Sequence, residues 1–214
     1  LMKTDELIDM LGTNLEPVKG GQLRKMLLVA LVVGAVAALC LMLAMFGAPA
    51  NALGGESFGL KVLALAFTLG LAAAGTSFLV RAARPGQPSR KPLVLIGLLF
   101  FAALSAGIAA LVLTNPTAWG GMVFGPQWAA CLTCIPLFSI APFVSLVWAL
   151  RKGAPTNLTR TGAVAGLVAG ALGAAVFAFH QPGDAIPFIV LWYGGSIVLC
   201  ALVGAIVGPR LLRW

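Results

Sequence analysis

The sequence predicts an all-α membrane protein, a bundle of six transmembrane helices with a short cytoplasmic amphipathic helix at its N-terminus. Three observations predict this class: the composition, six long apolar runs and a one-sided distribution of basic residues. Of the 214 residues, 60% are hydrophobic and 9% are charged, and the mean hydropathy is +1.03. A soluble domain carries charge on roughly 25% of its residues, so most of this surface must face lipid.

Six apolar runs are each long enough to cross the hydrocarbon core as a helix, which takes about 20 residues. They cover residues 26–46, 60–80, 93–113, 128–150, 162–179 and 186–207. Isolated strands cannot satisfy their backbone in lipid, and the alternating pattern of a barrel is absent. We therefore expect a cytoplasmic tail (1–25), a transmembrane domain (26–209) and a cytoplasmic C-terminus (210–214). An Ala-x-Ala pattern at 48–52 is typical of signal cleavage, but the first run is longer than a signal core and predicts a retained span.

The basic residues predict the orientation. Thirteen of the fourteen fall on one side of the expected topology: Lys3, Lys19, Arg24, Lys25, Arg81, Arg84, Arg90, Lys91, Arg151, Lys152, Arg160, Arg210 and Arg213. The exception is Lys61. By the positive-inside rule this side is cytoplasmic, so we expect a bacterial inner-membrane protein with both ends in the cytoplasm. The net charge of +8 then reflects topology and attraction to anionic lipid, and no basic, aromatic-rich soluble surface indicates a nucleic-acid partner.

The N-terminal tail has the pattern of a short amphipathic helix. Thr4 is a suitable N-cap and Pro17 ends the element. The apolar stripe consists of Leu7, Ile8, Leu11 and Leu15, and the acidic flank consists of Asp5, Glu6 and Asp9. A helix this short needs a partner. The acidic face disfavours the lipid interface and leaves two partners open: another protein, or the bundle's own basic loops.

Small residues, prolines and aromatic residues mark the later spans. The glycine ridges consist of Gly162, Gly166 and Gly170 in the fifth span and Gly204 and Gly208 in the sixth. Such ridges let helices approach closely, which favours packing within the chain over the alternative, a homodimer. Two prolines, Pro136 and Pro142, lie inside the fourth span and indicate either a hinge or a packing feature. The residues expected in an interfacial aromatic belt are Trp119, Trp128, Trp192 and Tyr193.

The predicted spans contain few residues that could catalyse a reaction or carry a proton. No ionisable side chain lies near the centre of a span, which argues against a proton-coupled pump, and no catalytic arrangement or cofactor motif indicates an enzyme. Cys40 and Cys200 are expected to be small apolar residues. Cys131 and Cys134, one turn apart, are either apolar packing residues, a redox pair or half of a metal site. Of these two, Cys131 is expected to lie close enough to the periplasm to meet an oxidant or metal.

At this point the sequence resembles the NrsF family of integral-membrane anti-sigma factors over the whole chain. The motifs that carry the resemblance are Met2-Lys3-Thr4-Asp5-Glu6-Leu7-Ile8-Asp9, Leu15-Glu16-Pro17, Cys131-Leu132-Thr133-Cys134-Ile135-Pro136-Leu137, Trp148-Ala149-Leu150-Arg151-Lys152-Gly153-Ala154-Pro155, Phe179-His180 and Leu191-Trp192-Tyr193. The resemblance implies an inhibitor that holds an extracytoplasmic-function sigma factor at the membrane and releases it on a periplasmic signal such as a heavy metal or oxidant. The tail would then contact the sigma factor.

The resemblance also implies a sensor with two periplasm-side cysteines. One matches Cys131, but the position after His180 is Gln181, so the expected pair cannot form. The remaining sensor combinations are Cys131 with Cys134, Cys131 with His180, or no cysteine chemistry. The alternative functions are a small transporter or channel, and a thiol-redox membrane protein that uses Cys131 and Cys134.

Overall fold

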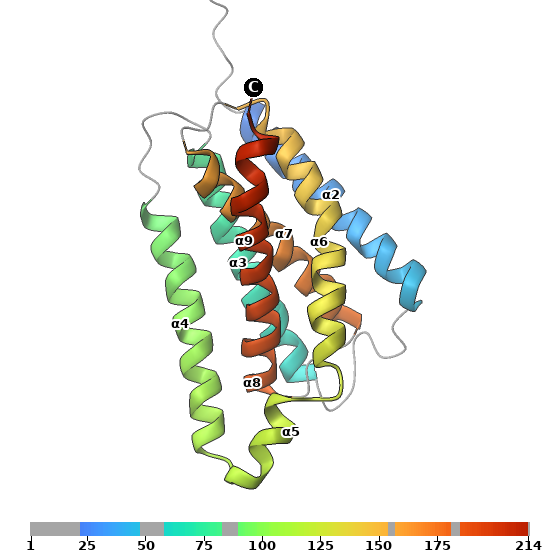
Figure 1. The fold of residues 1–214 in the computed structure, drawn as a ribbon, viewed down its shortest axis with the longest axis vertical. Helices are drawn as coiled ribbons and strands as arrows, with labels where there is room; N and C mark the ends of the chain where they lie inside the picture. The colour runs from blue at the N-terminus through green and yellow to red at the C-terminus, as the bar shows by residue number, and fades with distance from the viewer. Residues whose placement is uncertain (1–21, 48–57, 83–89, 154–156, 181–184, 214) are drawn as a thin grey trace, which may run out of the picture.

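The computed structural model describes residues 22–47, 58–82, 90–153, 157–180 and 185–213. Six helical stretches within these ranges are long and apolar enough to cross a membrane. The long helices are α2 (Gln22–Phe46), α3 (Phe58–Ala82), α4 (Arg90–Val112), α6 (Trp128–Leu150), α7 (Leu158–His180) and α9 (Gly194–Leu211) (Figure 1). The sixth stretch also includes α8 (Ile186–Phe188) and the π-helical turn η2 (Ile189–Tyr193). The predicted all-α fold with six such helices is confirmed.

The helices differ from the predicted apolar runs mainly at one end. α2 begins at Gln22, α7 begins at Leu158 and α9 continues to Leu211, each about one turn beyond the predicted run. Each predicted apolar run ends near the first charged side chain, whereas the helix itself continues past that residue. The connection after α4 contains η1 (Pro116–Ala118) and α5 (Trp119–Val123), which were not predicted.

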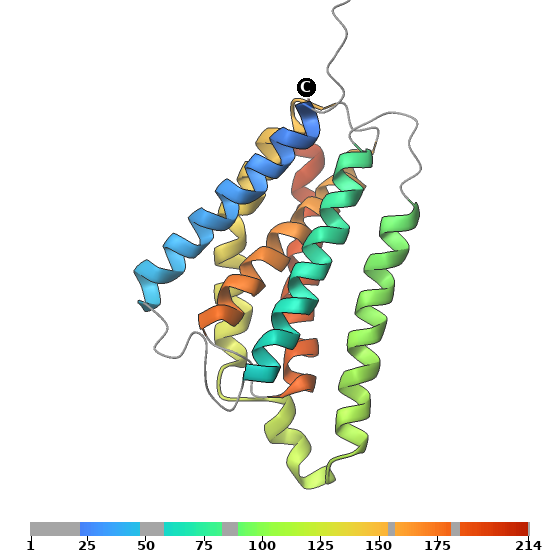
Figure 2. The ribbon, with the colours of Figure 1, turned by 180° about the vertical axis from the view of Figure 1, so that it is seen from behind.

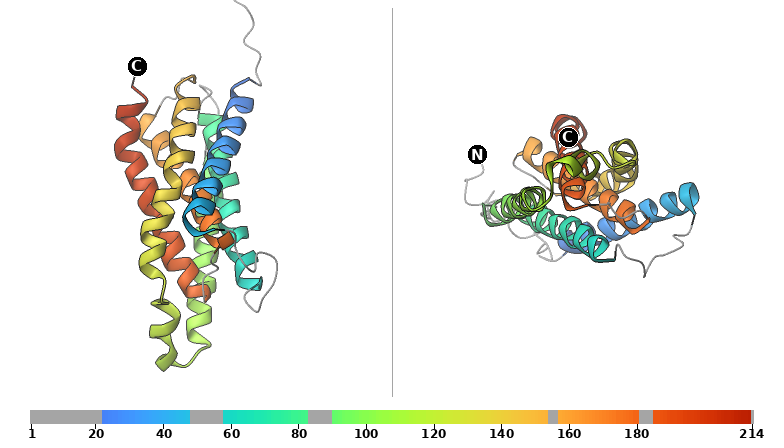
Figure 3. Two further views of the ribbon diagram at one scale, coloured as in Figure 1. Left: turned by 90° about the vertical axis from the view of Figure 1, so that its right-hand side faces the viewer. Right: turned by 90° about the horizontal axis from the view of Figure 1, so that it is seen from below.

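Successive long helices run in opposite directions, so the start of α2 and the end of α9 lie at the same end of the bundle (Figure 1). Viewed along the bundle, α2, α3 and α4 form one row, α6 and α9 lie opposite, and α7 lies between (Figure 3). α7 packs against α9, α6, α3 and α2, and most of its residues are buried. α4, at the periphery, buries only Pro92, Ile96 and Gly107.

The central position of α7 depends on glycine. A Cβ atom added to Gly162 would lie 2.8 Å from the Cα atom of Gly208, and one added to Gly204 would lie 3.0 Å from the Cα atom of Gly166. Real Cβ atoms do not tolerate such distances to backbone, so α7 and α9 are in backbone contact. The prediction that these ridges pack within the chain is confirmed, and they are therefore not free to form a homodimer.

Replacing Gly166 with alanine is expected to destabilise the bundle. The new Cβ atom would clash with the Cys200 carbonyl group of α9, and overpacking of this kind costs about 1–3 kcal/mol. We expect a lower midpoint of thermal unfolding in detergent. The matched control is Gly97→Ala on α4, where an added Cβ atom has no neighbour within 4 Å. An equal effect of the two substitutions would contradict the packing argument.

Candidate functional site

Basic side chains gather at the end of the bundle where α2 begins, which we call the basic end. The described residues include eleven lysines and arginines, of which ten lie there: Arg24, Lys25, Arg81, Arg90, Lys91, Arg151, Lys152, Arg160, Arg210 and Arg213. The eleventh, Lys61, lies near the opposite end in α3 and is only 5% exposed. All six Asp and Glu residues of the sequence fall outside the described ranges. The described part of this end is therefore uniformly positive.

Two of these basic side chains make defined contacts at the basic end. The Arg151 side chain donates a hydrogen bond from Nε to the Leu211 carbonyl oxygen at 2.7 Å, which joins the ends of α6 and α9. The Lys152 ammonium lies 4.3 Å from the centroid of the Trp148 ring, a cation–π distance. The predicted contact residues of the tail (Asp5, Glu6, Leu7, Ile8, Asp9, Leu11 and Leu15) lie outside the described residues. Gln22, the first described residue, opens α2 at this same end.

α2 is held against α6 by a close contact around the second proline of α6. A Cβ atom on Gly34 would lie 2.5 Å from the Cα atom of Pro142. The Ser145 hydroxyl lies 2.8 Å from the Ala30 carbonyl oxygen of α2 and 2.9 Å from the Pro142 carbonyl oxygen. α6 runs from Trp128 to Leu150 through both prolines. A helix that reaches the far end of the bundle is thus in direct contact with the helix that follows the tail.

Near the far end, the two cysteines of α6 occupy different environments. The Cys131 side chain is 0% exposed, and Ser196 of α9 donates a hydrogen bond to its carbonyl oxygen at 3.4 Å. Cys134 is partly exposed, and no disulfide joins any of the four cysteines. Cys131 was expected to lie close enough to the periplasm to meet an oxidant or metal; its side chain is buried, and Cys134 is the more exposed of the two thiols. Cys131 lies on the same helical face as Ile135 and Phe138, which points into the core.

His180, the last residue of α7, packs against the end of α2. Its ring centroid lies 5.1 Å from that of Phe46, and Phe46 also contacts Phe138 of α6 edge to face at 6.3 Å. The His180 Nδ1 atom is buried without a hydrogen-bond partner in the structure. Within the described ranges, no group of three or more His, Cys, Asp or Glu residues is arranged to hold a metal ion. His180 therefore links α7, α2 and α6 through aromatic contacts.

An aromatic cluster at the same end was only partly predicted. The Trp192 indole donates from Nε1 to the Val123 carbonyl oxygen at 2.7 Å, and its ring packs at a tilt against Trp128 with 5.3 Å between centroids. Trp119 and Trp128 are each 43% exposed, as expected for an interfacial belt, but Tyr193 is 0% exposed and packs against Phe177. Its assignment to the belt is wrong, because Tyr193 closes the π-helical turn η2 and lies in the core. Sequence periodicity at 3.6 residues per turn does not reveal a π-turn.

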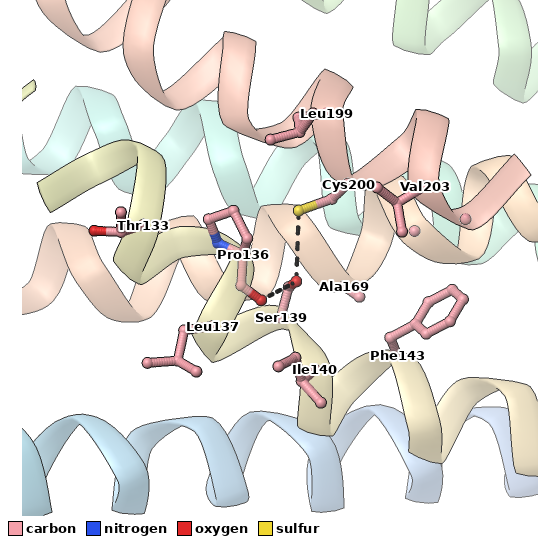
Figure 4. A pocket seen from close by; sticks show the side chains of 12 residues that line it. Thr133, Pro136, Leu137, Ser139, Ile140, Phe143, Ala169, Leu199, Cys200 and Val203 are labelled. Carbon is pink, nitrogen blue, oxygen red and sulfur yellow. Dashed lines mark hydrogen bonds between the residues drawn. The ribbon is translucent and has the colours of Figure 1, made fainter. Parts of the chain in front are cut away.

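A groove of about 420 Å³ lies between α6, α7 and α9, beside the first proline of α6 (Figure 4). Ser139 donates a hydrogen bond from Oγ to the Pro136 carbonyl oxygen at 2.7 Å, and its Oγ lies 3.4 Å from the Cys200 Sγ. Because the hydroxyl proton is directed to the carbonyl oxygen, the thiol is the donor in the second contact. The Ser139–Cys200 contact connects α6 to α9 beside the proline.

The fold defines a class: an all-helical protein whose six long apolar helices are of the kind that multi-pass membrane proteins use. The chain belongs to the NrsF family, described as "Negative regulator of sigma F", whose match covers residues 11–214. It is 31% identical over 216 residues to the "Probable anti-sigma-F factor NrsF" of Azospira oryzae, and 32% identical over 222 residues to the "Anti-sigma-F factor NrsF" of Caulobacter vibrioides. Both comparisons cover the full length of both chains. No solved structure matches the chain.

The burial of the cysteines predicts their reactivity. In variants that each retain one cysteine, we expect N-ethylmaleimide to modify Cys134 in the folded protein, since it is partly exposed and lies near the end of α6. Cys131 and Cys200 are buried and are expected to react only after unfolding. Mass spectrometry before and after denaturation measures this difference. Equal rates for Cys131 and Cys134 in the folded protein would show that the inner face of α6 is open.

Proposed function

We propose that the chain is a membrane-bound anti-sigma factor of the bacterial inner membrane. It sequesters an extracytoplasmic-function sigma factor at its cytoplasmic side and releases it in response to a periplasmic stress signal, a heavy metal or an oxidant. The observation that carries the proposal is the full-length similarity to two proteins named as anti-sigma-F factors. A regulator of this type acts by binding, so it needs an accessible contact segment and a means of changing that contact.

The charge distribution supports a cytoplasmic basic end. Ten of the eleven described basic residues lie there, and basic residues near the ends of spans remain preferentially in the cytoplasm. With this orientation, both termini are cytoplasmic and residues 1–25 are on the side where a sigma factor is present. His180, Trp119 and Trp128 are then near the periplasmic side.

The tail is the contact that we propose for the sigma factor. Its apolar stripe, led by Leu7, Ile8 and Leu11, suits helix-in-groove docking, and its acidic flank suits a basic rim on the partner. The uniformly positive basic end offers the same acidic flank a second binding place on the bundle itself. Exchange of the tail between the sigma factor and this surface would provide release without unfolding of the bundle.

For the sensor we propose the region around Cys131, Cys134 and His180. His180 rests on Phe46 at the end of α2, and α6 reaches α2 again at Pro142 and Ser145. A change at the periplasmic end would therefore be transmitted along α6 and α2 to the tail. The burial of Cys131 supports a role for the packing of α6, rather than open thiol chemistry, in this response.

Deletion of residues 1–20 is expected to abolish binding of the sigma factor. The measurement is a pull-down of candidate sigma factors by the detergent-solubilised protein, intact and truncated. As a matched control, Asp5→Asn, Glu6→Gln and Asp9→Asn together keep the apolar stripe and remove the acidic flank, so we expect weakened rather than abolished binding. If no sigma factor binds even the intact protein, the anti-sigma proposal fails.

Replacing both Pro136 and Pro142 with alanine is expected to leave sigma-factor binding intact and to impair induction. Alanine restores the backbone N–H groups that proline removes and stiffens α6, so the signal should reach α2 less effectively. A reporter gene driven by the sigma factor measures induction by the stress signal. Pro92→Ala, at the first turn of the peripheral α4, is the control and should not alter induction. Unchanged induction in the double variant would exclude the prolines from coupling.

A further inference from the structure

A groove of about 640 Å³ lies between α2, α3 and α7 and reaches the basic end. α2 and α3 diverge from this end with α7 between them (Figure 2), and Leu172 of α7 lies among the lining residues. Arg24, in the first turn of α2, and Arg81, in the last turn of α3, line the same groove. The groove thus combines two cationic side chains at one end with an apolar wall below them.

The wall below the arginines offers an occupant little hydrogen bonding. The lining residues include Thr76 and Ser77, but each hydroxyl already donates to a backbone carbonyl of α3 at 2.7 Å. The remaining lining side chains are aliphatic, and Leu28 and Leu69 are 45% and 50% exposed. From Arg81 to Leu69 the wall extends over twelve residues of helix, about 18 Å. Its surface suits a long apolar chain.

The two arginines are available to a ligand. Among the described residues, neither guanidinium group has a hydrogen-bond or ion-pair partner, whereas Arg151 at the same end is bound to the Leu211 carbonyl group. The Arg24 side chain is exposed and that of Arg81 is partly buried. Three other grooves of the bundle, between α6, α7 and α9, beside α4 and α9, and between α3 and α4, have no charged lining residue. Of these four grooves between described helices, the α2–α3 groove is the one that pairs charge with an apolar wall.

We propose that this groove binds one anionic phospholipid. The two arginines hold its phosphate, and an acyl chain lies along the aliphatic wall. The inference rests on the membrane insertion proposed above, which brings the basic end to the level of the cytoplasmic headgroups. Basic pockets between spans on the cytoplasmic side are a recognised mode of binding acidic lipids. The lateral opening of the groove toward the bilayer favours a lipid over a peptide, since it exposes leucines rather than hydrogen-bonding groups.

The test uses the intact protein purified in a neutral detergent, with phosphatidylglycerol or phosphatidylcholine of the same acyl chains added. Thermal unfolding and native mass spectrometry measure stabilisation and bound lipid. We expect phosphatidylglycerol to raise the unfolding midpoint more and to remain bound as one copy. In the double variant Arg24→Gln/Arg81→Gln, affinity for phosphatidylglycerol should fall about fivefold for each arginine removed, the ratio that corresponds to ~1 kcal/mol per basic residue.

The control Arg90→Gln/Lys91→Gln removes two charges from the start of α4, at the same end but outside the groove, and should keep the preference. Ala73→Phe, which fills the groove without changing charge, should lose bound lipid. Equal stabilisation by both lipids, or an equal loss in the Arg90/Lys91 control, would overturn the proposal. A preference that appears only after deletion of residues 1–20 would assign the groove to the tail instead.

The lipid-binding experiments use the purified protein without a sigma factor, so their outcomes do not depend on the anti-sigma role. A separate flotation assay with liposomes tests membrane insertion. If the protein does not float with the liposomes, the proposed membrane insertion is wrong. A protein that floats but shows no lipid preference would overturn only the proposed site.

Discussion

The close contact of α7 with its neighbours is the constraint on which the rest of the structure depends. Gly162, Gly166 and Gly204 bring α7 and α9 into backbone contact, and Gly173 brings α7 equally close to α6, where a Cβ atom would lie 2.7 Å from the Ile135 carbonyl oxygen. Apolar side chains provide little net attraction between helices in lipid, so association depends on close packing and on hydrogen bonds. α6, which carries Cys131 and Cys134, and α2, which follows the N-terminal tail, therefore both pack against α7.

Around this centre, the connection from one end of the bundle to the other is made by a small number of contacts. α6 carries Cys131 near one end, contacts α9 through Ser139, and contacts α2 through Pro142 and Ser145. α2 is exposed on most of its other residues. A helix with few buried neighbours can shift at a lower cost than α7, so displacement of α2 is the simplest structural basis for a change in the tail that precedes it.

Hydropathy and charge predicted the helix count, the alternation of helix direction and the gathering of basic residues at one end. The glycine ridges were also assigned correctly, because their four-residue spacing is a local signal. Which helix is central was not predictable, since α7 is no more apolar than α2 or α4 and centrality is a property of tertiary packing. The burial of Cys131 and Tyr193 was missed for related reasons. The burial of Cys131 depends on how α6 is rotated about its axis. The burial of Tyr193 depends on the one-residue insertion in η2.

The central position of α7 has a consequence for how the protein is made. α7 is the fifth of the six long helices in chain order, and α2 and α3 have few contacts with each other. Within the first 150 residues, only two separate pairs of helices can make their main contacts, α2 with α6 and α3 with α4, because α7, which joins the pairs, has not yet been made. Assembly of the bundle is therefore a late event, which is completed only when both α7 and α9 have been made. In the membrane insertion proposed above, the early helices would until then depend on the surrounding lipid to remain apart from the helices of other proteins.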